Sequence, residues 1–329
     1  MKQCLDKKIW SMKVPNKQAL LLTGGLHGML SQAAGLADAL GLTFEHRAIK
    51  LKKGWSKLPS QCVPARGFVF NEALPSSLPN VVISCGRHAA IASKLLKAKY
   101  KEDIFTIHIQ NPIIQTKYFD SVVIPEHDQF NGDAVITSLG AIHNLKYHAI
   151  EESMHDQHWP QSKRNQVAVI LGGPTKSFNW TTKAMASAID SLIQAAQIND
   201  YQLVFVPSNR TPKDTLEMIQ AKLTMPHQLV SEVTRSVYLN ALRASSHIVV
   251  TCDSASMLSE ACFTGKPVYC LTFPPRHKQE RLANLHQSLY AKEMVRPWQG
   301  KFESWSYVPL NEAKRISQML KEKYPHVFL

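Results

Sequence analysis

The chain has 329 residues, a length that predicts about two domains, each large enough to bury its own core. Hydrophobic residues make up 44% of the sequence and charged residues 19%, which excludes the disordered and fibrous classes. The formal net charge of +13 favours partners that carry phosphate, such as nucleotides or anionic lipids. The lysines are dispersed and no aromatic RNA-binding signature accompanies them, so we expect no nucleic-acid partner.

The first 18 residues are polar, contain five lysines and lack a continuous apolar stretch. We therefore expect a flexible leader over residues 1–18 rather than a secretory signal. No apolar run in the sequence approaches the roughly 18–20 residues that a membrane-spanning helix needs. The six cysteines form no CxxC pair, and a reduced cytoplasmic protein is the simple interpretation.

Short apolar runs alternate with helical stretches along the whole chain. In the first half the predicted strands are 19–23, 44–49, 81–84, 104–109, 121–124 and 134–138, and the predicted helices are 30–40 and 88–99. In the second half the predicted strands are 167–171, 201–206, 228–231, 247–251 and 267–271, and the predicted helices are 181–196, 212–223, 233–243, 254–263 and 310–323. Continuous Val/Ile/Leu strands between helices are typical of parallel sheets covered on both faces.

The pattern therefore predicts an α/β protein of two Rossmann-like, doubly wound domains that face each other across a cleft. The first domain spans residues 19–155 and the second residues 165–309, with a polar linker near 151–166. The last segment, 310–329, is predicted to end the chain as a helix. In such sheets, ligands bind outside the carboxyl ends of the strands.

A glycine-rich turn follows the first predicted strand. Gly24 and Gly25 precede His27, and the helix that follows contains Gln32. Glycines let the backbone approach a ligand, and His27 could act as a general base because histidine titrates near neutral pH. The alternative is a tight β–α turn with an incidental histidine.

A second glycine-rich turn, LGGPTKSF, follows the strand at 167–171. Its spacing excludes a P-loop and lacks the dinucleotide pattern GxGxxG. The remaining functional interpretation is a cradle for a diphosphate, with Gly172 and Gly173 giving main-chain amides and Lys176 and Ser177 giving further donors. A purely structural turn is the alternative.

The most specific signal is the stretch 251–267, TCDSASMLSEACFTGKP. Asp253 or Ser254 is expected to cap a helix that ends at Gly265. Ser254 and Ser256 lie near the helix N-terminus, where phosphate oxygens bind favourably. Glu260 shares a helix face with Ser256 and could accept both hydroxyls of a ribose. The alternative is an amphipathic helix whose Glu260 faces water.

Weaker candidates lie at other strand ends. Arg210 and Lys278 belong to polar or basic loops of the second half, and Arg87, Asn111 and Glu126 belong to loops of the first half. The arginines and the lysine could bind diphosphate or form a solvated surface. The cluster that begins at Glu126 is not spaced as a metal site, so we expect no metal.

These motifs together resemble GT-B glycosyltransferases and, over about residues 19–320, the mitochondrial-fission ELM-type family of glycosyltransferase-like proteins. The stretches that carry the resemblance are VVISCGRHAA, FTIHIQNP, VVIPEHD, SLGAIH, ILGGPTKSF, PSNRTP and VVTCDSASMLSEACFTGKPV. The resemblance implies a nucleotide-diphosphate sugar bound mainly by the second domain and an acceptor bound by the first. It also suggests that the final helix packs back on the first domain.

The resemblance assigns roles to the candidate residues. Glu260 would bind the ribose, and the residues near the diphosphate would be Gly172, Gly173, Ser254, Ser256 and, beside them, Met257. His27 would be the base, with Asn111 and Glu126 as weaker catalytic candidates; Gly24, Gly25, Gln32, Arg87 and Lys278 would lie on the diphosphate or acceptor side. Two departures are Pro174, where a polar residue is expected, and Asn111, where an aspartate is expected.

The resemblance implies metal-independent transfer of a sugar to a hydroxyl of a glycan or lipid-linked acceptor, such as one of surface-glycan or lipopolysaccharide synthesis, with no cofactor. Two alternatives stay open. The first is a non-catalytic adaptor on the cytosolic face of an anionic membrane, as the fission role of the family in plants suggests. The second is a nucleotide-sugar epimerase, which would form product without an acceptor.

Overall fold

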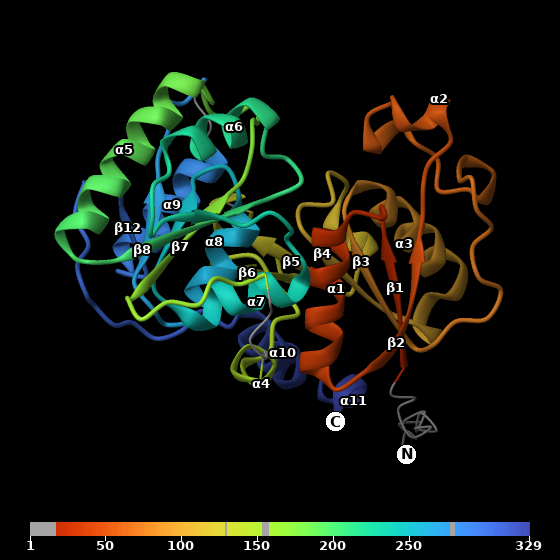
Figure 1. Ribbon diagram of the computed structural model, residues 1–329. Helices are drawn as coiled ribbons and strands as arrows, with labels where there is room; N and C mark the ends of the chain where they lie inside the picture. The colour runs from red at the N-terminus through yellow and green to blue at the C-terminus, as the bar shows by residue number, and fades with distance from the viewer. Residues whose placement is uncertain (1–17, 129, 153–157, 277–279) are drawn as a thin grey trace, which may run out of the picture. The chain divides into compact units, whose positions relative to one another are not determined.

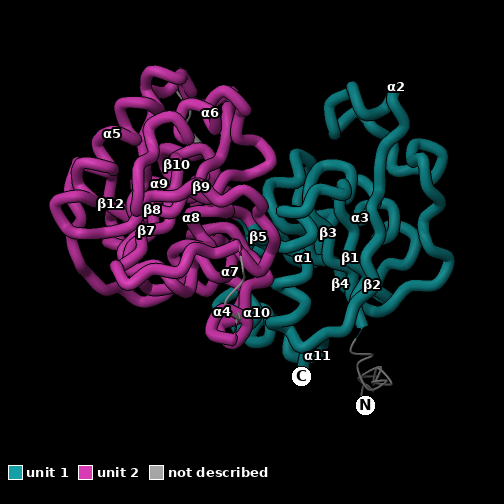
Figure 2. Tube along the Cα trace, viewed as in Figure 1, with its two compact units in different colours: residues 1–123, 132–136, 314–329 teal, residues 124–131, 137–313 magenta. Residues whose placement is uncertain are grey.

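The computed structural model describes residues 18–128, 130–152, 158–276 and 280–329 (Figure 1). The predicted leader and Lys278 therefore lie outside the described residues. The chain divides into two compact units (Figure 2). The first unit contains the chain up to Val123 together with Gly132–Ile136 and Lys314–Leu329, and the second contains Ile124–Asn131 and Thr137–Ala313.

The first unit is built on a six-stranded sheet with the order β2-β1-β3-β4-β5-β6. Its strands are β1 Gln18–Thr23, β2 Thr43–Ala48, β3 Val81–Cys85, β4 Phe105–Ile109, β5 Ser121–Pro125 and β6 Val135–Ser138. Its helices are α1 His27–Leu40, α2 Lys53–Ser56, α3 Arg87–Tyr100, α10 Glu312–Lys323 and α11 Pro325–Phe328, with short 3-10 turns at Ser60–Cys62, Gly67–Val69, Lys101–Asp103 and Thr116–Tyr118. The strand pairs from β2 to β5 are parallel.

The second unit has its own six-stranded sheet, with the order β12-β11-β10-β7-β8-β9 and parallel pairs throughout. Its strands are β7 Gln166–Leu171, β8 Gln202–Pro207, β9 Gln228–Leu229, β10 Ser245–Thr251, β11 Val268–Leu271 and β12 Val295–Pro297. Its helices are α4 Tyr147–Glu151, α5 Thr182–Ile198, α6 Lys213–Lys222, α7 Arg235–Ala244, α8 Ala255–Cys262 and α9 Glu280–Ala291, and a 3-10 turn spans Glu126–Asp128.

The strand order fixes where each unit can bind a ligand. In the first sheet the order reverses between β1 and β3, and in the second between β7 and β10. Helices that leave the two strands at such a switch point go to opposite faces of the sheet, so their connecting loops diverge at the carboxyl ends and leave a crevice. The glycine-rich turns after β1 and β7 both lie at these points.

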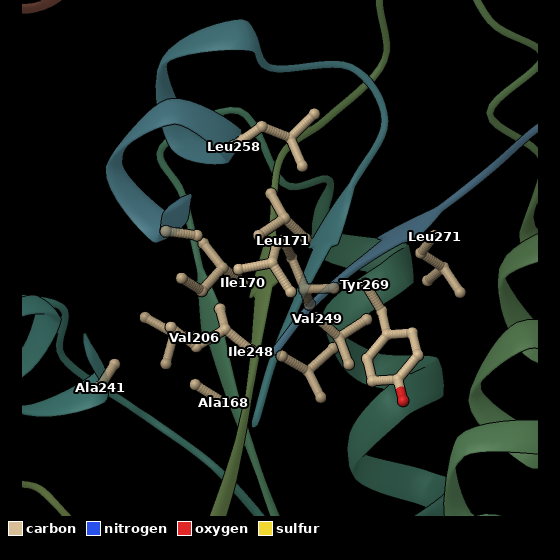
Figure 3. Close-up of a cluster of buried hydrophobic side chains, with 14 of the residues drawn as sticks. Ala168, Ile170, Leu171, Val206, Ala241, Ile248, Val249, Leu258, Tyr269 and Leu271 are labelled. Atoms are coloured by element: carbon tan, nitrogen blue, oxygen red, sulfur yellow. The ribbon is translucent and has the colours of Figure 1, made fainter. Parts of the chain in front are cut away.

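The second unit has a continuous apolar core because its central strands are covered on both faces. Every residue of β7 is buried, and Ile248, Val249 and Val250 of β10 are fully inaccessible. Figure 3 shows this core, with Ile170 and Leu171 beside side chains from β10 and with Leu258 from α8. Burial on both faces explains why the sequences of these strands are nearly continuous runs of Val, Ile and Leu.

The C-terminal segment belongs to the first unit. The Tyr324 hydroxyl donates a hydrogen bond to the carbonyl oxygen of Asp120 at 2.8 Å. The ring of Phe105 packs edge-on against Tyr324 and Phe328, with centroid distances of 4.8 and 5.5 Å. The chain therefore forms most of the first unit, continues through the second unit, and ends in the first unit with its C-terminal helices.

The predicted elements are present with bounds within three residues, but the strand β12, the helix α9 and the short helices α2, α4 and α11 were not predicted. The strand β12 is only three residues long, too short to show a period. The helix α9 follows a basic loop that the sequence pattern did not mark as a helix start. Both lie between the predicted strand at 267–271 and the last helix.

Buried histidines make the stability of the fold sensitive to acid. Burial lowers the pKa of His108 to about 3 and those of His143 and His286 to about 4. The His108 ring lies 2.8 Å from the Ser84 hydroxyl and stacks on Phe119. These histidines are neutral in the folded chain at pH values where an unfolded chain binds protons.

We predict that the free energy of unfolding falls as the pH drops through about 6.5, because only the unfolded chain takes up protons there. The loss between pH 7.5 and 5.5 is about 1 kcal/mol for each such histidine, and no loss is expected above that range. Urea titrations at both pH values measure it. His143→Gln should reduce the difference between the two pH values, because it removes one buried neutral histidine.

Candidate functional site

The loop after β7 approaches the loops after β8 and β10 so closely that two of its residues must be glycine. A Cβ on Gly172 would overlap the carboxylate of Asp253, and a Cβ on Gly173 would overlap the carbonyl oxygen of Arg210. Neither overlap can be relieved by moving a flexible side-chain end. The Asp253 carboxylate is fixed by its hydrogen bonds and its ion pair, and the Arg210 carbonyl oxygen belongs to the backbone. Gly172 and Gly173 are thus required by close approach.

The carboxylate of Asp253 is the centre of this arrangement, and its side chain is completely inaccessible. Its Oδ2 accepts from the Gly173 amide at 3.1 Å and lies 2.7 Å from Nη2 of Arg210. Its Oδ1 accepts from the Thr251 hydroxyl at 2.6 Å. The Thr251 hydroxyl in turn accepts from the Gly172 amide at 2.8 Å. A buried carboxylate is tolerated only with partners of this kind.

This network changes the role of the predicted diphosphate cradle. The amides of Gly172 and Gly173 already donate to Thr251 and Asp253. Each amide has one proton, so neither is available to a phosphate unless the network opens. The structure therefore departs from the expected main-chain cradle at this loop: the glycines allow close packing.

Arg210 is held by the same network but remains partly accessible. Its side chain is 45% exposed, in contrast to that of its partner Asp253. The loop that carries it is fixed by Thr211, whose hydroxyl donates to the Gly172 carbonyl oxygen at 2.6 Å, and by Ser208, which donates to the same oxygen at 3.2 Å. A guanidinium has five N–H donors, so a pair with one carboxylate leaves donors for an anion.

The helix α8 begins directly after Asp253. Ser254 is its N-cap and accepts from the Met257 amide at 3.3 Å, so its hydroxyl oxygen already serves the helix. The amides of Ala255 and Ser256 belong to the first turn, where a helix leaves N–H groups without internal acceptors. Met257 is partly buried against the core of the second unit. The first turn of α8 can thus receive an anion through its amides and the Ser256 hydroxyl.

Glu260 lies one turn further along α8 and is partly buried. Its Oε2 accepts a hydrogen bond of 2.7 Å from the hydroxyl of Tyr238 on α7. Burial raises the pKa of the Glu260 carboxyl, while Tyr238 and Arg235 act in the opposite direction. Glu260 is therefore not a freely solvated residue, and Tyr238 orients it.

The rim of the site is formed by the loop after the glycines. Lys176 is exposed. The carbonyl oxygen of Ser177 accepts from the Arg276 amide at 3.0 Å, and the Asn179 amide donates to the Pro274 carbonyl oxygen at 2.7 Å. The loop after β7 is thus paired with the loop after β11, just before the position of Lys278, which is not described.

The corresponding turn of the first unit is more open. Gly25 has a φ of +89°, a left-handed conformation that favours glycine, and its amide donates to the Thr23 hydroxyl at 3.1 Å. The preceding Gly24 is partly exposed. His27 is the first residue of α1 and is exposed, whereas Gln32 is buried within the helix. His27 is thus accessible to a ligand and Gln32 is not.

Arg87 has a structural role in this unit. Its Nε donates to the Ser60 hydroxyl at 2.9 Å, its Nη1 to the Ser56 carbonyl oxygen at 2.7 Å, and its Nη2 to the Leu58 carbonyl oxygen. All three nitrogens are therefore engaged with the segment between β2 and β3. Three of its five N–H donors are used in this way, which gives Arg87 a structural role and leaves two donors for the predicted diphosphate contact.

The two weaker catalytic candidates lie in different units. The Oδ1 of Asn111 accepts from the Ile113 amide at 2.9 Å, in a loop after β4 where Gln110 and Ile113 have φ values of +79° and +58°. Glu126 is exposed in a 3-10 turn that belongs to the second unit. Within the described part of the chain, no group of three or more His, Cys, Asp or Glu side chains could hold a metal ion.

Two residues of the site were not assigned a ligand-related role from the sequence. The sequence predicts only a helix-capping role for Asp253, and no local pattern marks Tyr238. An aspartate directly after a central strand, opposite a Gly-Gly turn, was the available signal for the first. Tyr238 had no local signal, since it meets Glu260 only when α7 and α8 pack together.

We predict that Gly172→Ala destabilises the second unit by about 1–3 kcal/mol, because the added methyl group overlaps the buried Asp253 carboxylate. Thermal or urea unfolding measures the change. The matched control is Gly28→Ala in the first turn of α1, where an added Cβ meets no atom within 4 Å and alanine favours the helix. Equal stability of Gly172→Ala and the wild type would contradict the close approach.

Comparison with known proteins agrees with this architecture. The family model described as Mitochondrial fission ELM1 matches residues 27–324. The mitochondrial fission protein ELM1 of Arabidopsis thaliana is 26% identical over 277 residues, which are 74% of this chain and 64% of that protein. The chain thus spans less than two thirds of the length of that relative.

Two solved structures of low sequence identity share the fold. The UDP-GlcNAc 2-epimerase of Methanocaldococcus jannaschii, solved with UDP-GlcNAc and UDP, matches with a TM-score of 0.51 and 12% identity, over 93% of this chain and 99% of that chain. The glycotransferase of kitacinnamycin matches with a TM-score of 0.53 and 13% identity, over 94% of each chain. The predicted fold class, two Rossmann-like domains of the GT-B kind, is confirmed. With the family model matched over most of its length, the chain belongs to the Mitochondrial fission ELM1 family.

Proposed function

We propose that the second unit binds a nucleotide-diphosphate sugar and that the protein transfers the sugar to a hydroxyl acceptor. The observation that carries the proposal is the pairing of the half-exposed Arg210 with the buried Asp253 at the switch point between β7 and β10, directly before the N-terminus of α8. The epimerase of similar fold, which was solved with UDP-GlcNAc and UDP, supports a nucleotide sugar as the ligand class.

The diphosphate would be bound by three kinds of donor. The free amides at the start of α8 and the Ser256 hydroxyl supply neutral donors at the positive end of the helix dipole. Arg210 supplies charge, and Asp253 holds its guanidinium in one orientation before the ligand arrives. The exposed Lys176 adds a second positive charge at the rim. This set replaces the glycine amides, which the Asp253 network already uses.

The ribose would be bound by Glu260. Tyr238 occupies Oε2, which leaves Oε1 and the remaining lone pairs to accept from ribose hydroxyls. Ser256 and Glu260 are four residues apart on α8, so they face the same side of the helix. With this spacing, the proposed phosphate contact and the proposed ribose contact would lie one helical turn apart.

Transfer requires a group that takes the proton of the acceptor hydroxyl. His27 is exposed at the start of α1 and can do so, whereas the amide of Asn111 cannot accept a proton. The negative charge that develops on the leaving diphosphate would be stabilised by Arg210 and the α8 N-terminus. These groups supply the positive charge without a metal ion, and no cofactor enters the proposed reaction.

The proposal predicts that Glu260→Ala weakens nucleotide binding by about 1–3 kcal/mol, because a ribose hydroxyl loses a charged acceptor. Tyr238→Phe should cost less, since the carboxylate remains but loses its orienting hydrogen bond. Calorimetric titration with UDP, GDP, ADP and CMP measures both. Glu217→Ala on α6, a surface carboxylate whose side chain is 67% exposed, is the matched control and should bind like the wild type.

Unchanged affinity in Glu260→Ala, or no binding of any of these nucleotides by folded wild type, would contradict the proposal. A donor-consumption assay with and without acceptor hydroxyls then separates the reactions. Transfer consumes the donor only with an acceptor, whereas an epimerase converts it without one. His27→Ala should lower turnover by about 100-fold or more while leaving nucleotide affinity unchanged.

A second candidate function, an adaptor at an anionic membrane, is favoured by the segment 50–68. This segment contains five Lys and Arg residues and no Asp or Glu. Phe68 is 59% exposed and Leu58 is 40% exposed. Basic residues beside exposed apolar side chains are typical of surfaces that contact anionic lipid headgroups. No helix in the described part of the chain is long and apolar enough to cross a bilayer.

The adaptor candidate predicts that the protein floats with vesicles that contain phosphatidylserine and not with neutral phosphatidylcholine vesicles. Replacing both Lys52 and Lys53 with Glu should lower vesicle affinity by about tenfold or more. Lys213→Glu is the control, because that side chain is 90% exposed in the other unit. Equal loss in the control would show general electrostatic attraction and would contradict a dedicated segment.

A further inference from the structure

The strand β2 forms one edge of the first sheet, and among the described residues no strand lies beyond it (Figure 1). All six of its residues, Thr43 to Ala48, are exposed, although its partner β1 is buried from Ala19 onward. The pairing of β1 with β2 runs from Gln18–Thr43 to Thr23–Ala48 without a break. The strand is thus regularly paired, and it lacks the proline or bulge that commonly protects an edge.

The hydrogen bonds show which residues of β2 point outward. The Ile49 amide donates inward to the Thr23 carbonyl oxygen at 2.8 Å. On the outer side, the Lys52 amide donates to the Val69 carbonyl oxygen at 2.9 Å, and the Lys50 carbonyl oxygen accepts from Asn71 at 3.0 Å. Because these directions alternate along a strand, the backbone groups of Phe44, His46 and Ala48 also point outward.

The same contacts limit the length of the open edge. Beyond Ala48, the segment near Phe70 covers the outer side through its antiparallel bridge with Leu51. The open stretch therefore has His46 at its centre, with Phe44 and Ala48 at equal distances on either side. A partner strand must fit this short stretch and must use the same outward groups.

We propose that β2 pairs antiparallel with β2 of a second copy of this chain, around a two-fold axis at His46, so that two sheets join into one. In this register Phe44 lies opposite Ala48 of the second copy, and His46 lies opposite its own counterpart. Each of these pairs exchanges two N–H···O=C hydrogen bonds, as outward-pointing residues in an antiparallel pair do.

The charges of β2 favour this register. Residues 45 and 47 lie on the same face of the strand, and the two-fold axis places Glu45 of each copy directly opposite Arg47 of the other. In the described part of the single chain, neither Glu45 nor Arg47 has an ion-pair partner. Charged residues on an edge normally prevent association, but here their order is self-complementary. A homodimer therefore satisfies both charges twice.

The other face of the strand is also compatible with the pairing. Phe44 has 39% of its surface exposed, and the small Ala48 opposite leaves room for its ring. The His46 ring is within 2.9 Å of the Thr23 hydroxyl in its own chain, so it is held on β1 and away from the strand edge. The proposed interface requires no change in the sheet of either copy.

Sedimentation velocity on the full chain tests the proposal. At about 0.1 mM the wild type should sediment as a dimer of the 36.9 kDa chain. Arg47→Glu and Glu45→Arg should each weaken dimerisation about tenfold or more, because each places like charges opposite one another at two positions. A mixture of the two variants should form heterodimers, because Glu and Arg again face each other throughout.

Circular dichroism melts and nucleotide titration of both variants control for folding and for the donor site, which lies in the other unit. A monomeric wild type at about 0.1 mM would overturn the proposal. Dimers that both charge reversals leave intact, or a mixture of the variants that stays monomeric, would overturn it equally. None of these results affects the proposed nucleotide binding, since β2 takes no part in it.

Discussion

The candidate site depends on the buried carboxylate of Asp253. A carboxylate removed from water is costly unless its lone pairs are satisfied, and here an amide, a hydroxyl and a guanidinium satisfy them. These partners come from the loops after β7, β8 and β10, so one side chain fixes three connections at the carboxyl edge of the second sheet. The Gly-Gly sequence follows from the same constraint, because the space that a Cβ would need is already filled.

This arrangement separates structural groups from groups that can meet a ligand. The glycine amides and Asp253 are used internally, whereas Arg210 and the first turn of α8 keep donors for an anion. The ordering of Arg210 is achieved during folding, so a ligand would not need to immobilise that side chain. Tyr238 likewise orients the Glu260 carboxylate before a ligand binds. A site with its polar groups already oriented is what stabilisation of a leaving diphosphate requires.

The first unit uses similar residue types differently. Arg87 gives three of its five N–H donors to the segment between β2 and β3, and Asn111 stabilises its own loop. The basic segment 50–68 is therefore fixed to α3, which positions its exposed Phe68 and lysines on a stable base. Membership of the Mitochondrial fission ELM1 family is compatible both with catalysis in the second unit and with a docking role for the first. The two roles rest on different residues and can be tested separately.

The sequence by itself determined the alternation of strands and helices, the two glycine turns and the polar stretch around α8, because these features depend on short-range periodicity and on residues at strand ends. It therefore predicted both sheets and the loops in which the candidate site lies. Tertiary structure decided what each polar group does. Whether the amides of Gly172 and Gly173 are free, whether Arg87 is engaged, and whether Glu260 meets Tyr238 all depend on segments that are 22 to 80 residues apart in the chain. Such contacts leave no local pattern, since hydrogen-bond partners are chosen only when the loops pack together.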